Sequence, residues 1–418
     1  MTGSYHNTDV IIVGAGTSGL SAARALKSAG VDTLVVEAAD HVGGRCVTEN
    51  GTFSVPFDRG GSWLHSAEIN PLARLAETEG VTLHKKSWRW ERVFSDGHTL
   101  SETEVNDYSK YMDLMWDRVN QMGIIQPKAA IDQVLPDGPW KDTAKMFVAQ
   151  MLGGDFDATS AADSANYADA EGDWLVAGGL GNFVRHLHLD IEVVLNCPVS
   201  KIDYSGPNVR ATTPMGTIEA RHLILTVSTG VLAAEKIEFE PKLSYRKLQA
   251  IDQLPNGLLN KIAIEFDPSW KEVHEGYMAD YHQGDDEYCT ILFRSFDSDL
   301  SVGFVAGRFA DQLECQGEGA ATEFCLTGLK ELFGSDVIKY IRKTSETEWR
   351  ANANTIGSYS FARPGYAGAR EILAETVDER LFFAGEATMP NTFATVHGAY
   401  LSGKETAQKV LGCCRGFK

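Results

Sequence analysis

The chain has 418 residues, 43% hydrophobic and 23% charged, which is the composition of an ordinary globular protein with room for two domains. Its formal net charge of −19 argues against nucleic-acid binding, although an acidic surface suits a cationic substrate. The sequence shows no signal-peptide pattern and no apolar run of about eighteen residues, so we expect no membrane segment, and seven irregularly spaced cysteines favour a reduced, cytoplasmic protein.

The stretch that ends at Glu37 has the pattern of a strand, a glycine-rich turn, a helix and a second strand. The apolar runs Val10–Val13 and Thr33–Val36 predict strands buried on both faces. The motif Gly14-x-Gly16-x-x-Gly19 lies between them, and its glycines permit a tight turn, close approach of a pyrophosphate and close packing of the helix. The helix N-terminus offers free N–H groups to phosphates, and Glu37 can accept hydrogen bonds from ribose hydroxyls. This arrangement predicts a dinucleotide site.

Two glycine pairs follow. The pair Gly43-Gly44 lets a loop pass close to a ligand, and Arg45 supplies a cation for a pyrophosphate. The second pair opens Gly60-Gly61-Ser62-Trp63, with His65 close behind. Together with the first motif, these segments resemble the flavin-containing amine oxidases, which include monoamine oxidases, polyamine oxidases and lysine-specific histone demethylases. The resemblance implies FAD rather than NAD as the dinucleotide.

The resemblance also implies a fold. We expect an α/β protein with a Rossmann-type FAD-binding domain of the p-hydroxybenzoate-hydroxylase-like (GR2) topology and a discontinuous α+β substrate-binding domain. The FAD-binding domain is expected to comprise residues 1–75, 185–266 and 344–418, and the substrate-binding domain residues 76–184 and 267–343.

Apolar periodicity and turn residues place the other elements. Helices are expected over Pro71–Glu79, Glu102–Met122, Lys141–Met151 and Ala320–Phe333. Strands are expected over Ile191–Leu195, Val199–Tyr204, Val209–Thr212, His222–Val227, Thr290–Phe293, Val302–Ala306 and Leu381–Ala384. A helix beyond Thr395 is expected to bury Ala399, Gly403, Ala407 and Val410 on one face.

The segment from Leu258 to Phe266 alternates, with Lys261 on the face opposite to Ile262. The pattern alone is typical of a lysine on a solvated strand face. However, Lys261 matches the lysine that holds a water against flavin N5 in the resembled family, so the resemblance implies a functional role.

The C-terminal part carries the most specific matches. Tyr359 matches one wall of the family's aromatic cage, which binds the amine against the flavin. The second wall, a tyrosine in monoamine oxidases, is replaced by Thr395, which leaves Phe393 or Trp349 as candidates for part of it. His65 falls where vertebrate polyamine oxidases have a histidine, although a structural role stays open. The candidate catalytic residues are therefore Lys261, Tyr359, His65 and Thr395.

The resemblance also implies the cofactor contacts. Glu386 would meet the polar linker of FAD, and the helix beyond Thr395 would point its N-terminus at the flavin pyrimidine. The full expected set is Gly14, Ala15, Gly16, Thr17, Ser18, Gly19, Glu37, Ala38, Gly44, Arg45, Gly60, Gly61, Ser62, Trp63, Val199, Thr226, Trp349, Gly385, Glu386, Thr395 and Val396. We expect FAD to be held without a covalent bond, because Ser358 occupies the position of the cysteine that attaches flavin in monoamine oxidases.

These features predict an FAD-dependent oxidase of a small primary or secondary amine, with polyamines among the candidate substrates. Hydride transfer to flavin would leave an imine, and O2 would reoxidise the flavin to give H2O2. No metal site is evident, and we expect a monomer or homodimer. An L-amino-acid oxidase stays open and would need an arginine in the cavity, for which the candidates are Arg89, Arg92, Arg294, Arg308 and Arg363.

Three other readings are disfavoured. Lys261 and Gly357-Ser-Tyr-Ser argue against the related carotenoid desaturases. Histone demethylation is not expected, because those enzymes carry additional nucleosome-binding regions. A flavin-binding module without turnover is disfavoured by the intact Lys261 and Tyr359.

Overall fold

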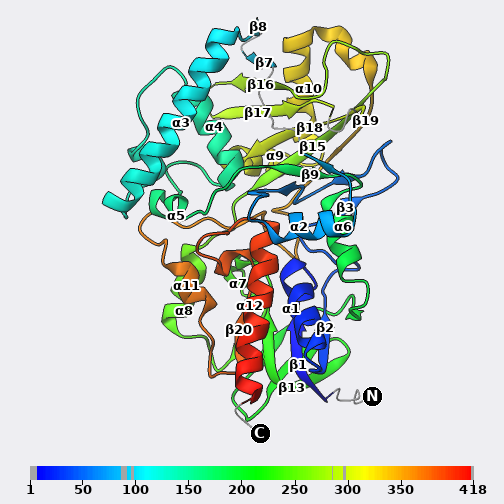
Figure 1. Ribbon diagram of the computed structural model, residues 1–418, viewed down its shortest axis with the longest axis vertical. Coiled ribbons are helices and arrows are strands. Elements are labelled where there is room, and N and C mark those ends of the chain that lie inside the picture. The colour runs from blue at the N-terminus through cyan, green and yellow to red at the C-terminus, as the bar shows by residue number, and fades with distance from the viewer. Residues whose placement is uncertain (1–6, 86–91, 96–97, 285, 295–297, 416–418) are drawn as a thin grey trace.

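The computed structural model describes residues 7–85, 92–95, 98–284, 286–294 and 298–415. These residues form two halves that are stacked along the long axis of the molecule, each built on one large sheet (Figure 1).

The first sheet has eight strands in the order β10-β2-β1-β13-β12-β11-β14, and β20 also pairs with β13. Strands β10, β2, β1, β13 and β20 are parallel, whereas β12 is antiparallel to both of its neighbours. The strands are β1 (Asn7–Val13), β2 (Thr33–Val36), β10 (Val193–Val194), β11 (Lys201–Asp203), β12 (Val209–Thr213), β13 (Gly216–Leu225), β14 (Glu238–Glu240) and β20 (Leu381–Phe383). The predicted α/β fold is thus confirmed, while the Rossmann-type FAD-binding domain with p-hydroxybenzoate-hydroxylase-like topology stays a prediction.

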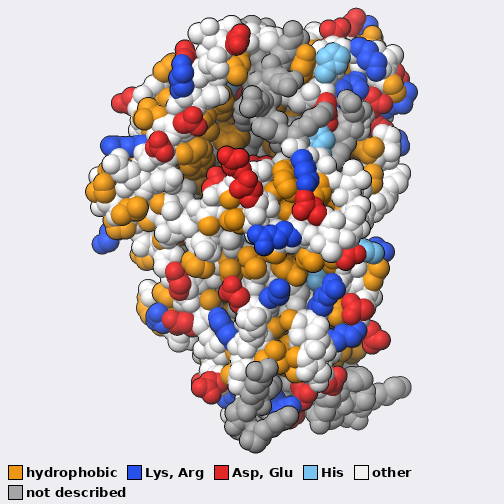
Figure 2. Space-filling view, viewed as in Figure 1, with side chains coloured by type: hydrophobic (Ala, Val, Ile, Leu, Met, Phe, Trp, Pro, Cys, Tyr) orange, Lys and Arg blue, Asp and Glu red, His pale blue; other side chains and the backbone are white. Residues whose placement is uncertain are grey.

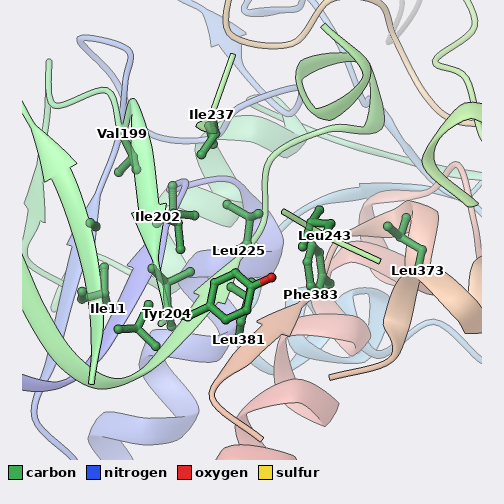
Figure 3. Close-up of a cluster of buried hydrophobic side chains, with 14 of the residues drawn as sticks. Ile11, Val199, Ile202, Tyr204, Leu225, Ile237, Leu243, Leu373, Leu381 and Phe383 are labelled. Carbon is green, nitrogen blue, oxygen red and sulfur yellow. The ribbon is translucent and has the colours of Figure 1, made fainter. Parts of the chain in front are cut away.

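Both faces of this sheet are buried, as the apolar runs predict. Val10 and Ile12 pack against α1 (Thr17–Ser28) and α12 (Val396–Arg415), which lie side by side at the front in Figure 1. Ile11 faces the opposite side, in the cluster that Figure 3 shows with Leu381 and Phe383 of β20. That side is covered by α7 (Thr229–Ala233), α8 (Tyr245–Gln253) and α11 (Ala369–Ala374).

The second sheet has the order β19-β15-β18-β17-β16-β7-β8 and is mainly antiparallel. Its strands are β7 (Arg92–Ser95), β8 (His98–Thr99), β15 (Leu259–Phe266), β16 (Tyr277–Gln283), β17 (Glu287–Leu292), β18 (Leu300–Ala306) and β19 (Ile341–Glu346). Helices α9 (Gly307–Gln316) and α10 (Ala320–Phe333) contribute apolar residues to its core.

The remaining elements lie beside or between the two sheets. The helices are α2 (Pro71–Thr78), α3 (Glu102–Ile125), α4 (Lys141–Leu152), α5 (Ala161–Ala165) and α6 (Leu180–Leu187), with short 3-10 turns at Ile131–Gln133, Ser335–Tyr340 and Glu386–Thr388. The small strands are β3 (Thr48–Glu49), β4 (Phe57–Asp58), β5 (Trp63–Leu64), β6 (Leu83–His84) and β9 (Trp174–Val176).

The position of β15 and the presence of α9 are among the differences from the sequence-based expectation. Strand β15 pairs with β18 and β19 of the second sheet, although the expected boundary at residue 266 assigns it to the FAD-binding domain. Helix α9 was not predicted, because it continues directly from β18 with no side-chain cap at Ala306. The division into two domains otherwise stays a prediction.

The face drawn in Figure 2 shows acidic side chains interspersed with lysines and arginines. No helix among the described residues is both long and apolar enough to cross a membrane.

Candidate active site

One cavity of about 970 Å³ runs from the glycine motif of the first sheet to the second sheet. This volume is near the upper end of the ~300–1,000 Å³ range of small-molecule sites. We call its lining near β1, β2 and α1 the cofactor half. The lining from α4, β15, β16, β17 and β18 is the substrate half.

The cofactor half begins at the turn between β1 and α1. Gly14 has φ +103°, and a Cβ added there would lie 2.5 Å from Thr226 Oγ1. Gly14, Gly16, Thr17 and Ser18 line the cavity. Gly16 caps α1 without a side-chain hydrogen bond, and the buried Ser18 hydroxyl has no hydrogen-bond partner. A helix N-terminus with free donors and an unpartnered hydroxyl fits a pyrophosphate.

Two residues of the motif support the turn without lining the cavity. Ala15 donates its N–H to Glu37 Oε2 over 2.7 Å. A Cβ added at Gly19 would lie 2.0 Å from the carbonyl oxygen of Gly14, so only glycine allows this packing. Ala15 and Gly19 therefore shape the turn between β1 and α1, which we call the glycine cradle, without lining the cavity.

Glu37 stands at the end of β2 and is buried. Its Oε1 accepts from the N–H of Ala39 over 2.9 Å, so two backbone donors fix the carboxylate at the cavity wall. Its remaining lone pairs are available to hydroxyl donors such as those of a ribose. Ala38, Val199 and Thr226 also line this end of the cavity.

The next part of the wall comes from the two glycine pairs and the segment after β20. Arg45 Nη1 donates to Glu386 Oε1 over 3.0 Å, and both side chains line the cavity. Gly60 has to be small, because a Cβ there would lie 1.9 Å from the carbonyl oxygen of Arg45. The structure places the other expected residues of this region, Gly44, Gly61, Ser62, Trp63, Gly385 and Val396, in the same wall.

Lys261 of β15 lines the cavity and is buried. The solvated strand face that the alternating pattern alone predicts for this lysine is therefore wrong. Its Nζ donates to the backbone oxygens of Asp58 over 2.9 Å and Gly60 over 2.6 Å, and to the hydroxyl of Ser62. These three acceptors match the three donors of an ammonium group. Burial lowers the pKa of Lys261 to about 8, an effect that the nearby charge of Asp58 partly offsets.

Tyr359 lines the cavity between Ser358 and Ser360, and its hydroxyl donates to the backbone oxygen of Gln150 on α4. Burial, assisted by the charge of Glu386, raises the pKa of Tyr359 well above its usual value, so the phenol stays protonated. The aromatic wall therefore bridges the two halves of the molecule.

The candidates for the second wall separate clearly. Trp349 lines the cavity, whereas Phe393 does not and instead packs its ring 3.9 Å from the guanidinium carbon of Arg370. Thr395 lines the cavity, and its hydroxyl accepts from the N–H of Gly398 over 2.9 Å. Thr395 therefore caps the first turn of α12, whose N-terminus faces the cavity.

His65 lines the cavity beside Trp63, with ring centroids 6.3 Å apart. Its Nδ1 lies 2.8 Å from Asp173 Oδ1, and the pKa of Asp173 is lowered by this hydrogen bond in spite of partial desolvation. His397 of α12 is another neighbour: burial, and secondarily the charge of His65, lowers the pKa of His397 to about 4. His397 is therefore neutral near pH 7.

Most of the substrate half was not predicted. Its apolar part consists of Phe147, Met151, Leu259, Met278, Leu292 and Phe304, and its polar part includes Gln150 and Thr290. Phe147, Gln150 and Met151 follow the three-and-four spacing of one helical face, a signal that the predicted helix already carried. Asp173 lies two residues beyond the acidic Asp169–Glu171 segment, where sequence gives no reason to single it out.

The arginines proposed to pair with a substrate carboxylate do not meet this need. Arg294, Arg308 and Arg363 do not line the cavity, and Arg89 and the side chain of Arg92 lie outside the described residues. Among the described lining residues the arginines are Arg45 and Arg59, and each is paired with a glutamate: Arg45 with Glu386 and Arg59 with Glu49.

The family model of flavin-containing amine oxidoreductases matches residues 17–113 and 117–411. The chain belongs to this family. FAD is therefore its cofactor, and the glycine cradle, the unpartnered Ser18 hydroxyl and the fixed Glu37 carboxylate fit that dinucleotide.

Similar members of the family include enzymes of different substrates. The chain is 31% identical to rice polyamine oxidase 4 over 96% of its own length and 88% of that protein. It is 29% identical to human lysine-specific histone demethylase 2 over 97% of its own length. It spans about half, 54%, of the length of that relative.

Solved structures of amine oxidases share the fold. A putrescine oxidase bound to putrescine has a TM-score of 0.80 at 21% identity and covers 98% of this chain and 100% of that one. Cyclohexylamine oxidase from Brevibacterium oxydans IH-35A has a TM-score of 0.81 at 22% identity, with the same coverage. At these identities the likeness concerns the fold alone.

Proposed function

We propose that this family member is an FAD-dependent oxidase of small amines, with di- and polyamines as its preferred class. FAD, when bound, would accept a hydride from the carbon next to an amine nitrogen while that nitrogen loses a proton, which leaves an imine, and O2 would take up the two electrons and two protons to give H2O2. The imine is then hydrolysed to a carbonyl product and an amine or ammonia.

The supporting observation is the lining of the substrate half. Its apolar walls, together with Tyr359 and Lys261, suit an amine, and the arginines among the described residues that line the rest of the cavity are already paired. A carboxylate-bearing substrate would thus enter an apolar space without an unpaired arginine, and the three donors of Lys261 are already taken, so its burial is costly. This favours an amine over an α-amino acid.

The chain's own residues have distinct tasks in this proposal. Tyr359 holds the amine against the flavin through its aromatic face, since its hydroxyl is occupied by Gln150. Lys261, held by three oxygens, is placed to supply positive charge near the reacting atoms, and a water that it orients would replace one of these three oxygen partners. Thr395 contributes by capping α12, whose positive end would favour negative charge on the reduced cofactor.

The preference for di- and polyamines depends on Asp173. Among the described lining residues the carboxylates are Glu37, Glu386 and Asp173, and the first two belong to the cofactor half. Asp173 is exposed and borders the cavity, where it can attract the second ammonium group of an extended substrate. His65, fixed by Asp173, is placed to accept a proton from an incoming amine.

The test is anaerobic mixing of the purified holoenzyme with separate compounds: putrescine, spermidine, spermine, benzylamine, L-leucine and a peptide with a dimethylated lysine. We expect di- and polyamines to bleach the flavin absorbance, and air to restore it with release of H2O2. Bleaching by the peptide alone would replace this proposal with demethylation, and bleaching by L-leucine alone with amino-acid oxidation. No bleaching by any compound would favour a flavin-binding module.

A further inference from the structure

A fully buried ion pair lies behind the cavity wall. Arg370 of α11 is 0% exposed and Asp163 of α5 is 1% exposed. Arg370 Nε donates to Asp163 Oδ1 over 2.8 Å, and Nη2 donates to Oδ2 over 2.7 Å. This two-pronged geometry fixes the plane of the guanidinium. Neither residue lines the cavity.

The third side of the guanidinium faces the cofactor half. Arg370 Nη1 donates to Ser360 Oγ over 2.9 Å, and Ser360 Oγ donates to Glu386 Oε2 over 2.7 Å. Glu386 Oε1 in turn accepts from Arg45. Negative and positive side chains therefore alternate from Asp163 through Arg370 and Glu386 to Arg45, with Ser360 as the bridge. We call these five residues the buried ion chain.

The orientation of Glu386 depends on this chain. Its two oxygens accept from four donors: Arg45 Nη1, the N–H and hydroxyl of Ser360, and the N–H of Ala394. Glu386 and Arg45 line the cavity, whereas Ser360 and Arg370 stand behind them. The geometry thus connects a fully buried arginine to two groups that face the cofactor.

Stability alone does not account for such a chain. Removing buried charges from water is expensive, and well-packed apolar residues in their place are often as stable or more stable. Buried charges whose far end meets a ligand-binding wall have a further use, because they fix the groups that the ligand contacts before it arrives.

We infer that Arg370 is a positioning residue for FAD binding, which acts through Ser360 on Glu386 and Arg45. This inference goes beyond the proposed function and does not depend on which amine is oxidised. It also connects α5, in the segment expected to belong to the substrate-binding domain, to the cofactor: Asp163 orients Arg370, and Arg370 orients the wall that FAD contacts.

The first test is Ser360→Ala, which removes the bridge and leaves the Arg370–Asp163 pair intact. The FAD dissociation constant is measured by serial dilution of the purified holoenzyme, from the fluorescence of released flavin. We expect it to rise about tenfold, the loss expected for a hydrogen bond to a charged group. The matched control is Ser301→Ala, which removes an equally buried serine of β18 that accepts from the N–H of Arg294. Equal constants for Ser360→Ala and the control would overturn the inference.

The second test examines the connection itself. The double variant Asp163→Asn, Arg370→Gln removes both charges together, so that no unpaired charge stays buried. We expect it to weaken FAD binding to a similar extent, and addition of Ser360→Ala to cause little further loss, because both changes interrupt one chain. Additive losses, or a double variant with the wild-type constant, would show that Arg370 supports the fold without positioning the cofactor wall.

Discussion

The two halves of the cavity are built in different ways. In the cofactor half, backbone groups, glycines and paired charges make the wall: Glu37 is held by two N–H donors, and Arg45 by Glu386. In the substrate half, apolar side chains from α4 and four strands of the second sheet make most of the wall, with few polar groups among them. A fixed polar surface selects one cofactor. On an apolar surface, by contrast, the few polar side chains decide which substrate binds.

Lys261 stands where the two halves meet. It comes from a strand of the second sheet, yet its ammonium is held by backbone and side-chain oxygens of Asp58, Gly60 and Ser62. These residues lie in Asp58–Trp63, the segment that carries the second glycine pair and that we call the second glycine segment. The cofactor half thereby fixes the charge that the substrate half presents.

The largest expected effect concerns the cofactor half. If its polar contacts alone retain FAD, heat or acid precipitation releases all of the flavin to the supernatant and leaves a colourless pellet. Ser358 has no thiol that could attach the flavin, and its buried hydroxyl accepts a hydrogen bond from the N–H of Leu259 over 3.0 Å. Cys46 lines the cavity, but burial raises the pKa of its thiol, which opposes thiolate formation. Yellow colour that stays with the pellet would contradict non-covalent binding.

The next effect concerns Lys261. We expect Lys261→Met to slow flavin reduction by amine, reoxidation by O2, or both, by about ten- to a hundredfold, which corresponds to about 1.4–2.7 kcal/mol in the barrier. FAD should stay bound, because the cradle is unchanged. Stopped-flow absorbance measures both half-reactions.

The matched control is Lys247→Met. Lys247 is also buried, with its pKa lowered to about 8 by burial, but it donates to backbone oxygens of residues 372, 373 and 375 and does not line the cavity. We expect its half-reactions to stay at the wild-type rate. Wild-type rates of both half-reactions in Lys261→Met would show that Lys261 is a buried strand residue without a role in the reaction.

A pH dependence follows from the same lysine. The pKa of Lys261 falls from an ordinary 10.5 to about 8 in the folded protein, so between these pH values the unfolded chain binds more protons. Stability from this group therefore rises with pH from about 8 to about 10.5. We expect the gap in unfolding free energy between Lys261→Met and wild type to shift in favour of wild type by about 1–3 kcal/mol over that range. Urea unfolding at pH 7.5 and about pH 10 measures it, and a constant gap would contradict it.

The smallest effect concerns Asp173. Asp173→Asn keeps the shape but removes the charge, and we expect kcat/KM for spermidine to fall about two- to fivefold while that for benzylamine changes less, because an exposed charge contributes at most about 1 kcal/mol. His65→Ala should alter the pH profile for both substrates. Glu171→Gln removes an exposed carboxylate that does not line the cavity and is the control. Equal losses in Asp173→Asn and Glu171→Gln would point to overall charge rather than to this position.

The fold and the cofactor half were largely predictable because their signals are local. The strand Thr33–Val36 and the helix Ala320–Phe333 have the predicted bounds, and Gly14, Glu37, Arg45 and Glu386 line one cavity as the resemblance implies. Glycine requirements and a strand–turn–helix pattern are written in consecutive residues, so a short window of sequence suffices to find them.

The substrate half was not predictable in the same way, because tertiary contacts create it. Lys261 has the pattern of a surface strand, and only pairing with β18 and β19 and contact with the second glycine segment bury it. Phe393 and Trp349 are both aromatic residues in this part of the sequence, yet the Phe393 ring packs against the Arg370 guanidinium instead of lining the cavity. Asp173 gains its position from His65, which is 108 residues away in the chain.

The most direct test of the central claim compares putrescine with L-ornithine, which differ by one α-carboxylate. The substrate half offers that carboxylate no unpaired arginine among its described residues, so we expect putrescine to reduce the bound flavin under anaerobic conditions at least about a hundredfold faster at equal concentration, a difference of about 2.7 kcal/mol. Reduction by L-ornithine at an equal or higher rate would contradict the assignment of amines as substrates and with it the account of how the two halves divide their tasks.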